Sequence, residues 1–122
     1  MLRTGVDLIE VSRIQESAER FGERFYKRFF TPAERAYCAG RYPALAARFA
    51  AKEAVAKALG TGIGDVSWVE IEVTQGERNK PEIKLDGAAA ELATRLGLTQ
   101  WSISISHTHE HAIAFVVAAG DG

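Results

Sequence analysis

The chain has 122 residues, of which 47% are apolar and 25% are charged, and its formal net charge is −1. This length and balance predict one globular domain over residues 1–122 and exclude a disordered or fibrous protein. Cys38 is the only cysteine, which excludes an intramolecular disulfide and a thiolate metal cage, so we expect a packed thiol rather than a nucleophile.

The start of the chain has no apolar segment of signal-peptide form, and no stretch is long enough to span a bilayer. We therefore expect a cytoplasmic protein without a membrane partner. Charge is uneven: residues 1–59 carry eleven Lys or Arg against seven acids, and the remainder carries four against nine. This asymmetry favours an anionic partner that binds the first half of the chain, although a solvated face explains the charge equally well. We do not expect this partner to be a nucleic acid.

The first part of the chain predicts a strand followed by short helices. Residues 4–11 alternate as in a strand, and residues 12–21 have the period of a helix. Residues 25–30 continue as a helical or irregular segment. Thr31-Pro32-Ala33-Glu34 predicts a capping box that opens a short helix through Cys38.

The alanine-rich segment 43–59 is the strongest helix prediction, and Gly60 stops it. Hairpins interleaved with helices predict an α+β fold, a mainly antiparallel sheet packed with helices. The remaining predicted elements are strands at 66–74 and 81–85, a helix at 86–96, and strands at 101–106 and 112–118.

The predicted helix 43–59 carries charges in unusual places. Lys52 falls inside its apolar stripe, where a buried ammonium group needs an anion or a route to solvent. Glu53 and Lys57 lie four residues apart on the flank of that stripe, which is also the spacing of a surface ion pair. Spacing alone therefore favours a structural pair.

Asp7 interrupts a strand that is otherwise apolar at Val6 and Leu8. A carboxylate there costs stability unless it is hydrogen-bonded, paired or bound to a metal. Mg²⁺ takes carboxylates together with water and phosphate oxygens, and rarely an all-protein cage. Asp7 and Glu53 could therefore supply the protein ligands of one Mg²⁺.

Two further patterns carry weaker signals. Gly60-Thr61-Gly62-Ile63-Gly64 lacks the Walker spacing and predicts a helix stop and a turn. His107, His109 and His111 alternate along a tight turn, and such residues rarely converge on one zinc ion. A single histidine could instead hydrogen-bond a phosphate beside the hydroxyl of Thr108, and His107 is nearest the predicted sheet.

Three segments together resemble one known family. They are Gly5-Val6-Asp7-Leu8, Arg48-Phe49-Ala50-Ala51-Lys52-Glu53-Ala54 with Lys57-Ala58-Leu59-Gly60, and Ser104-Ile105-Ser106-His107-Thr108. In order and spacing they resemble the holo-acyl-carrier-protein synthases, the small stand-alone branch of the 4′-phosphopantetheinyl transferases. The resemblance runs over residues 5–117 and implies the fold of that family.

The resemblance also implies a reaction, in which the 4′-phosphopantetheine moiety of coenzyme A moves to a serine of apo acyl-carrier protein and adenosine 3′,5′-bisphosphate leaves. It implies that Asp7 and Glu53 bind the Mg²⁺ that bridges the pyrophosphate. Lys57 is similar in position to a lysine proposed as the proton acceptor, although Glu53 or a metal-bound water could serve. A homotrimer with active sites between subunits is implied as well.

Other residues match family positions that contact the substrates. Arg13 matches a first-helix arginine that meets acidic residues of the carrier protein. The residues that match positions near the coenzyme A phosphates are Arg48, Lys52, Lys57, His107 and Thr108.

Two positions depart from the family pattern. Ile9 stands where larger, pseudo-dimeric transferases have a second acid, which favours the trimeric branch. Asn79 replaces glycine in the family's Gly-Lys-Pro turn, which puts the contact of that turn with the nucleotide in question. Two alternatives stay open: a coenzyme A or nucleotide-binding module without catalysis, and a metal-dependent phosphohydrolase of a small diphosphate.

Overall fold

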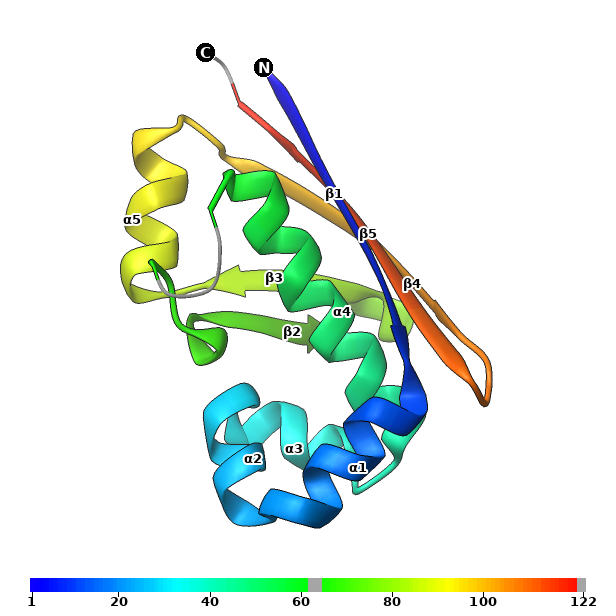
Figure 1. Ribbon diagram of the computed structural model, residues 1–122. Helices are drawn as coiled ribbons and strands as arrows, with labels where there is room; N and C mark the ends of the chain where they lie inside the picture. Colours follow the sequence, from blue (N-terminus) through cyan, green and yellow to red (C-terminus); the bar gives the residue numbers. More distant parts are fainter. Residues whose placement is uncertain (62–64, 121–122) are drawn as a thin grey trace.

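The computed structural model describes residues 1–61 and 65–120 (Figure 1). Single-turn 3-10 helices occupy Trp68–Glu70 and Glu77–Asn79. The helices and strands are, in chain order, β1 (Leu2–Glu10), α1 (Val11–Phe21), α2 (Glu23–Phe29), α3 (Pro32–Cys38), α4 (Tyr42–Leu59), β2 (Ile71–Gln75), β3 (Pro81–Leu85), α5 (Gly87–Arg95), β4 (Gln100–His107) and β5 (His111–Ala119).

The strands form two antiparallel sheets. A three-stranded sheet has the order β1-β5-β4, and a two-stranded sheet pairs β2 with β3. Figure 1 shows the helices and the β2–β3 hairpin on one side of the three-stranded sheet, with α4 crossing between the two sheets. The prediction of an α+β fold with a mainly antiparallel sheet is confirmed.

Helix α4 is the centre of the fold because it is buried on almost every side. Alanines dominate its contacts, which lets neighbouring backbones approach closely. The closest approach is at Gly5 of β1, where a Cβ atom would lie 1.8 Å from the carbonyl oxygen of Ala54. Only glycine allows β1 to lie this near the helix, so Gly5 determines the distance between β1 and α4.

Two apolar clusters share α4. One packs the C-terminal half of the helix against both sheets and α5, and the other packs its N-terminal half against α1, α2 and α3. Cys38 belongs to the second cluster, is fully buried, and has a pKa that burial raises above its ordinary value. This environment is that of a packed, unreactive thiol.

Some boundaries differ from those predicted. The strand predicted over 4–11 ends at Glu10, and Val11 already begins α1. The strand predicted over 66–74 begins only at Ile71, because a capping box from Ser67 to Glu70 turns the chain into a 3-10 helix first. The predicted capping box at Thr31 and Glu34 is confirmed. Among the described residues, no helix has the length and apolar character needed to cross a membrane.

Candidate functional site

A cavity of about 470 Å³ lies where β1, α1, α2 and α4 meet. It brings together Asp7 and Glu53, the two carboxylates expected to share a metal, and Arg13 of the first helix. Its lining residues are Asp7, Leu8, Ile9, Arg13, Ile14, Glu16, Ser17, Phe25, Phe29, Phe49 and Glu53.

Asp7 reaches this cavity because successive side chains of β1 alternate between the two faces of the strand. Gly5 and Asp7 lie on the face of the strand that meets α4, whereas Val6 and Leu8 lie on the exposed face. The Asp7 side chain is 19% exposed, and its Oδ1 lies 3.3 Å from Nζ of Lys57. Lys57 also donates to the carbonyl oxygen of Val6 at 2.9 Å, so the ammonium group holds β1 and α4 together at this level.

Glu53 lies one helical turn before Lys57 and is half-buried. Burial raises its pKa, the negative charge of Asp7 raises it further, and Lys57 acts in the opposite direction. The two carboxylates are therefore near enough to repel each other while they share one cation. In the part of the chain that the structure describes, Lys57 forms its ion pair with Asp7 rather than with Glu53.

The residues at this site fit a divalent cation that keeps part of its hydration shell. Two carboxylates on one cavity, with a repulsion that a cation would relieve, match the ligand preference of Mg²⁺. No group of three or more His, Cys, Asp or Glu that could hold a metal occurs among residues 1–61 and 65–120. A metal held here would therefore take its other oxygens from water or from a bound phosphate.

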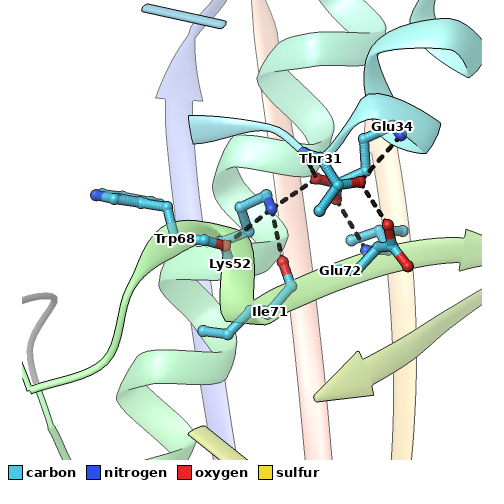
Figure 2. Close-up of polar contacts among 7 residues, drawn as sticks. Thr31, Glu34, Lys52, Trp68, Ile71 and Glu72 are labelled. Carbon is cyan, nitrogen blue, oxygen red and sulfur yellow. Dashed lines mark hydrogen bonds and ion pairs between the residues drawn. The ribbon is translucent and has the colours of Figure 1, made fainter. Parts of the chain in front are cut away.

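Lys52 is not among the residues that line this cavity, and its place near the coenzyme A phosphates stays a prediction. Its side chain is fully buried, and Nζ lies 2.7 Å from Oε1 of Glu34. Figure 2 shows the same ammonium group donating to the carbonyl oxygens of Trp68 and Ile71, at 3.0 and 2.6 Å. Burial lowers the pKa of Lys52, and Glu34 opposes that effect. Its donors are used inside the protein.

Arg48 lies one turn before Lys52 and is also buried, with 4% of the residue exposed. Its guanidinium carbon lies 4.2 Å from the ring centroid of Tyr37, and its Nε has no hydrogen-bond partner within the described part of the chain. With the Gln75 amide oriented to satisfy both its groups, its oxygen accepts from Arg48 at 2.5 Å and its nitrogen donates to the carbonyl oxygen of Asn79 at 2.6 Å. Arg48 thus meets the turn between β2 and β3.

Asn79 keeps the backbone shape that a glycine would adopt in this turn. Its φ is +59°, and that of Arg78 is +56°. Asparagine is one of the few side chains that tolerate this left-handed conformation. Replacement of glycine by Asn79 therefore preserves the path of the chain before Lys80 and Pro81.

His107 and Thr108 lie at the exposed turn between β4 and β5, outside the lining of the Asp7–Glu53 cavity. The hydroxyl of Thr108 accepts from the backbone N–H groups of Glu110 and His111, at 3.2 and 3.1 Å. Within one chain, the structure does not bring these two residues to the carboxylates. The Gly60–Gly64 turn is described only at Gly60 and Thr61; Gly60 caps α4 with a φ of +76°, and positions 62–64 lie outside the described residues.

Comparison with known proteins places this site in a family. The sequence model of the 4′-phosphopantetheinyl transferase superfamily matches residues 3–116, which include every element of the site. The chain belongs to this superfamily. The resemblance inferred from the three sequence segments is thereby confirmed.

Relatives within the superfamily match nearly the whole chain. The holo-[acyl-carrier-protein] synthase of Herpetosiphon aurantiacus is 49% identical over 98% of this chain and 100% of its own length. That of Dehalococcoides mccartyi is 50% identical over 97% of this chain and 98% of its own length. The crystal structure of Helicobacter pylori holo-[acyl-carrier-protein] synthase in complex with coenzyme A has a TM-score of 0.87 at 35% identity, with 95% of this chain and 99% of that chain covered.

Two residues of this transferase fold could not be assigned their contacts from the sequence. Glu34 was explained fully as a helix cap, although the buried ammonium of Lys52 called for an anion somewhere. Gln75 ends a strand and carried no signal of its own, because only the hairpin geometry places it against Arg48.

Proposed function

We propose that this protein transfers the 4′-phosphopantetheine moiety of coenzyme A to a serine of apo acyl-carrier protein, giving holo carrier protein and adenosine 3′,5′-bisphosphate. The observation that carries the proposal is the convergence of Asp7 and Glu53 on one cavity in a chain of this superfamily. In this reaction the serine oxygen forms a bond to the phosphorus that carries pantetheine. The bond between that phosphorus and the bridging oxygen breaks, and the bridging oxygen leaves with the nucleotide.

Asp7 and Glu53 are the proposed ligands of Mg²⁺, which would supply charge neutralisation on the pyrophosphate. Lys57 keeps the Asp7 carboxylate in place by bridging it to the backbone of β1. The serine proton needs an acceptor at the cavity, and two side chains are close. One candidate is Glu53, whose pKa is raised above its ordinary value by burial and by the charge of Asp7, and the other is Lys57.

The proposed docking surface for the carrier continues from the cavity across α1 and α2. A smaller hollow of about 240 Å³ shares Ser17, Phe25 and Phe29 with the cavity and adds Phe21, Arg24 and Arg28. Arg13 at the cavity, together with Arg24 and Arg28, gives this surface cationic side chains beside the exposed ring of Phe21. Such a surface suits a partner with acidic side chains around an apolar patch, and it directs the serine toward the metal site.

The proposed assembly is a homotrimer built on the open face of the three-stranded sheet. Val6 and Phe115 are opposite neighbours on this face, as are Leu8 and Ile113, and all four are 40% or more exposed. Contiguous apolar surface of this kind is typical of an interface. We propose that His107 and Thr108 of one subunit complete the site formed by the carboxylates of the next. Location in the cytoplasm stays a prediction from the sequence.

The transfer is tested by mass spectrometry of apo acyl-carrier protein incubated with the enzyme, coenzyme A and Mg²⁺. We expect the carrier to gain the mass of phosphopantetheine, and EDTA to prevent the gain. An unchanged mass across a panel of carriers would contradict the proposal. Release of nucleotide from coenzyme A at a rate that the carrier does not raise would indicate hydrolysis instead.

Shared active sites are tested by mixing two inactive variants, Glu53→Gln and His107→Ala, after partial dissociation. If each site draws residues from two subunits, mixed trimers contain some intact sites and regain activity. Activity that stays at the level of the separate variants would contradict a shared site.

A further inference from the structure

The cavity that contains Asp7 and Glu53 has an aromatic side. Three phenylalanines line it, Phe25 and Phe29 from α2 and Phe49 from α4. The ring centroids of Phe25 and Phe29 lie 5.1 Å apart, and those of Phe29 and Phe49 lie 5.4 Å apart. The three rings therefore form one continuous surface, the aromatic wall. Phe49 lies one helical turn before Glu53, which places the wall beside the carboxylates.

Trp68 supports the aromatic wall from behind. It is buried, with 8% of the residue exposed, and it is not among the residues that line the cavity. Its ring stacks on Phe49 with 4.6 Å between centroids and an angle of 27° between the planes. The same ring makes a T-shaped contact with Phe29 at 5.0 Å. One indole thus contacts both half-buried rings of the wall and joins α2 to α4 at this level.

The backbone of Trp68 is itself held in place. Lys52 Nζ donates to its carbonyl oxygen at 3.0 Å, and the same ammonium group is paired with the fully buried Glu34 (Figure 2). A capping box between Ser67 and Glu70 encloses Trp68 in its single-turn 3-10 helix. Movement of Trp68 would break a buried hydrogen bond to a charged group, so the ring behind the wall has a fixed position.

A transferase that acts on a phosphate ester must keep water from the same phosphorus. Water is in large excess over any carrier protein. Attack by its oxygen would break the same bond to the bridging oxygen and give free 4′-phosphopantetheine and adenosine 3′,5′-bisphosphate. The phenylalanine rings offer no hydrogen-bonding group, so a water molecule beside them is not held in position for attack. The polar side of the cavity, where Arg13 and Ser17 lie, is the side that a docked carrier is proposed to cover.

We propose that Trp68 is a positioning residue for the choice of nucleophile: it holds Phe29 and Phe49 in the aromatic wall, and the wall favours the carrier serine over water. This inference rests on the proposed function and adds to it a determinant of specificity outside the cavity. Trp68 acts through the phenylalanine rings and contributes no group to the reaction.

The test counts the nucleotide released for each carrier molecule modified. Wild-type enzyme with coenzyme A, Mg²⁺ and apo carrier should release adenosine 3′,5′-bisphosphate and transfer phosphopantetheine in equal amounts. In Trp68→Leu the smaller side chain leaves space behind both rings, so the ratio of nucleotide to modified carrier should rise to about two or more. Free 4′-phosphopantetheine should account for the difference. Trp68→Phe keeps a ring that can stack on Phe49, and its ratio should stay nearer that of the wild type.

The matched control is Trp101→Leu. Trp101 is a half-buried tryptophan of β4 that packs against the apolar cluster of both sheets and α5, away from the aromatic wall. This variant loses the same side-chain volume and should keep the wild-type ratio. An unchanged ratio in folded Trp68→Leu, or an equal rise in both tryptophan variants, would overturn the inference. A wild type that modifies no carrier would contradict the proposed function instead.

Two further measurements decide the matter if Trp68→Leu does not fold. Phe49→Leu removes a ring from the wall itself and should also raise the ratio. In Trp101→Phe, Trp68 is the only tryptophan left, so its fluorescence can be followed alone. Acrylamide should quench it weakly, because the structure covers the indole with Phe29 and Phe49. Quenching as strong as that of free tryptophan, or a wild-type ratio in Phe49→Leu, would overturn the inference.

Discussion

Lys52 and Glu53 are consecutive residues of α4, yet they lie in two opposite kinds of charged environment. Lys52 is fully buried and its donors are matched by Glu34 and two carbonyl oxygens. Glu53 faces a cavity beside a second carboxylate, and the ammonium group of Lys57 is paired with Asp7. Unmatched charge thus marks the site that is able to bind a ligand, whereas complete pairing marks the structural site.

The electrostatics of the two sides follow from this difference. On the Lys52 side, one positive and one negative group balance in a dry environment. On the Glu53 side, two carboxylates share one ammonium group, and the pKa of Glu53 is raised by burial and then by Asp7. A divalent cation would remove the excess negative charge.

The largest expected effect is the loss of turnover in Glu53→Gln. The change is isosteric and removes a negative charge that the metal needs, so the rate of carrier modification should fall by about a hundredfold or more. Thermal unfolding should stay close to that of the wild type, because the residue is only half-buried. Glu19→Gln, at an exposed position of α1, is the control. A Glu53→Gln protein with most of its activity would remove Glu53 from the site.

On the other side of α4, Lys52→Met should act on stability. The variant leaves the Glu34 carboxylate buried without its cation, which typically costs about 3–5 kcal/mol of unfolding free energy. Urea denaturation measures the loss, and adding Glu34→Gln to the same chain should recover most of it. A single variant as stable as the wild type would show that the pair is not the balanced unit described above.

Gly5→Ala should disturb both the packing of β1 against α4 and the position of Asp7, with a smaller effect than the two changes above. The new methyl group would lie 1.8 Å from the carbonyl oxygen of Ala54, so β1 must move away from α4. Overpacking of this kind costs about 1–3 kcal/mol. Because the displaced strand carries Asp7, the concentration of Mg²⁺ needed for half-maximal turnover should rise as well. Unchanged stability and metal dependence would show that the close contact between strand and helix is not required.

The smallest expected effect is a change in the pKa of Glu53. Carbon-13 NMR of its carboxyl group, recorded in metal-free protein as the pH is varied, measures this pKa. Its pKa should lie above that of ordinary glutamates, fall in Asp7→Asn and rise in Lys57→Met. The folded protein then binds this proton more tightly than the unfolded chain. The contribution of Glu53 to stability should therefore decrease as the pH rises from its unfolded pKa through its folded pKa. A Glu53 pKa at the ordinary value of glutamate, unchanged in both variants, would contradict the crowding of the two carboxylates.

Much of this arrangement could be predicted from local sequence patterns. The alternation around Asp7 and the alanine-rich helix before Gly60 indicated the strand and helix that carry the carboxylates, and Thr31 with Glu34 indicated the capping box. The 3-10 turn at Trp68–Glu70 was missed, although Ser67 and Glu70 have the spacing of a second capping box. The alternation of apolar residues through Val66–Thr74 had favoured one continuous strand.

The partner of Lys52 could not be predicted in the same way. Glu34 lies eighteen positions earlier in the chain and already had a local role as a cap, so nothing in its neighbourhood indicated a second contact. The Arg48–Gln75 contact depends on the register between α4 and β2, which is a property of packing rather than of either segment. Contacts of this kind follow from the three-dimensional arrangement alone.

One divalent cation held between Asp7 and Glu53 is central to the proposed activity. Titration with Mn²⁺ in the presence of coenzyme A, followed by electron paramagnetic resonance, tests this directly on the wild type, Asp7→Asn, Glu53→Gln and the Glu34→Gln/Lys52→Met double variant. We predict a bound ion in the wild type and in the double variant once coenzyme A is saturating, and its loss when either Asp7 or Glu53 is replaced. Binding of Mn²⁺ that survives both single replacements would contradict the site.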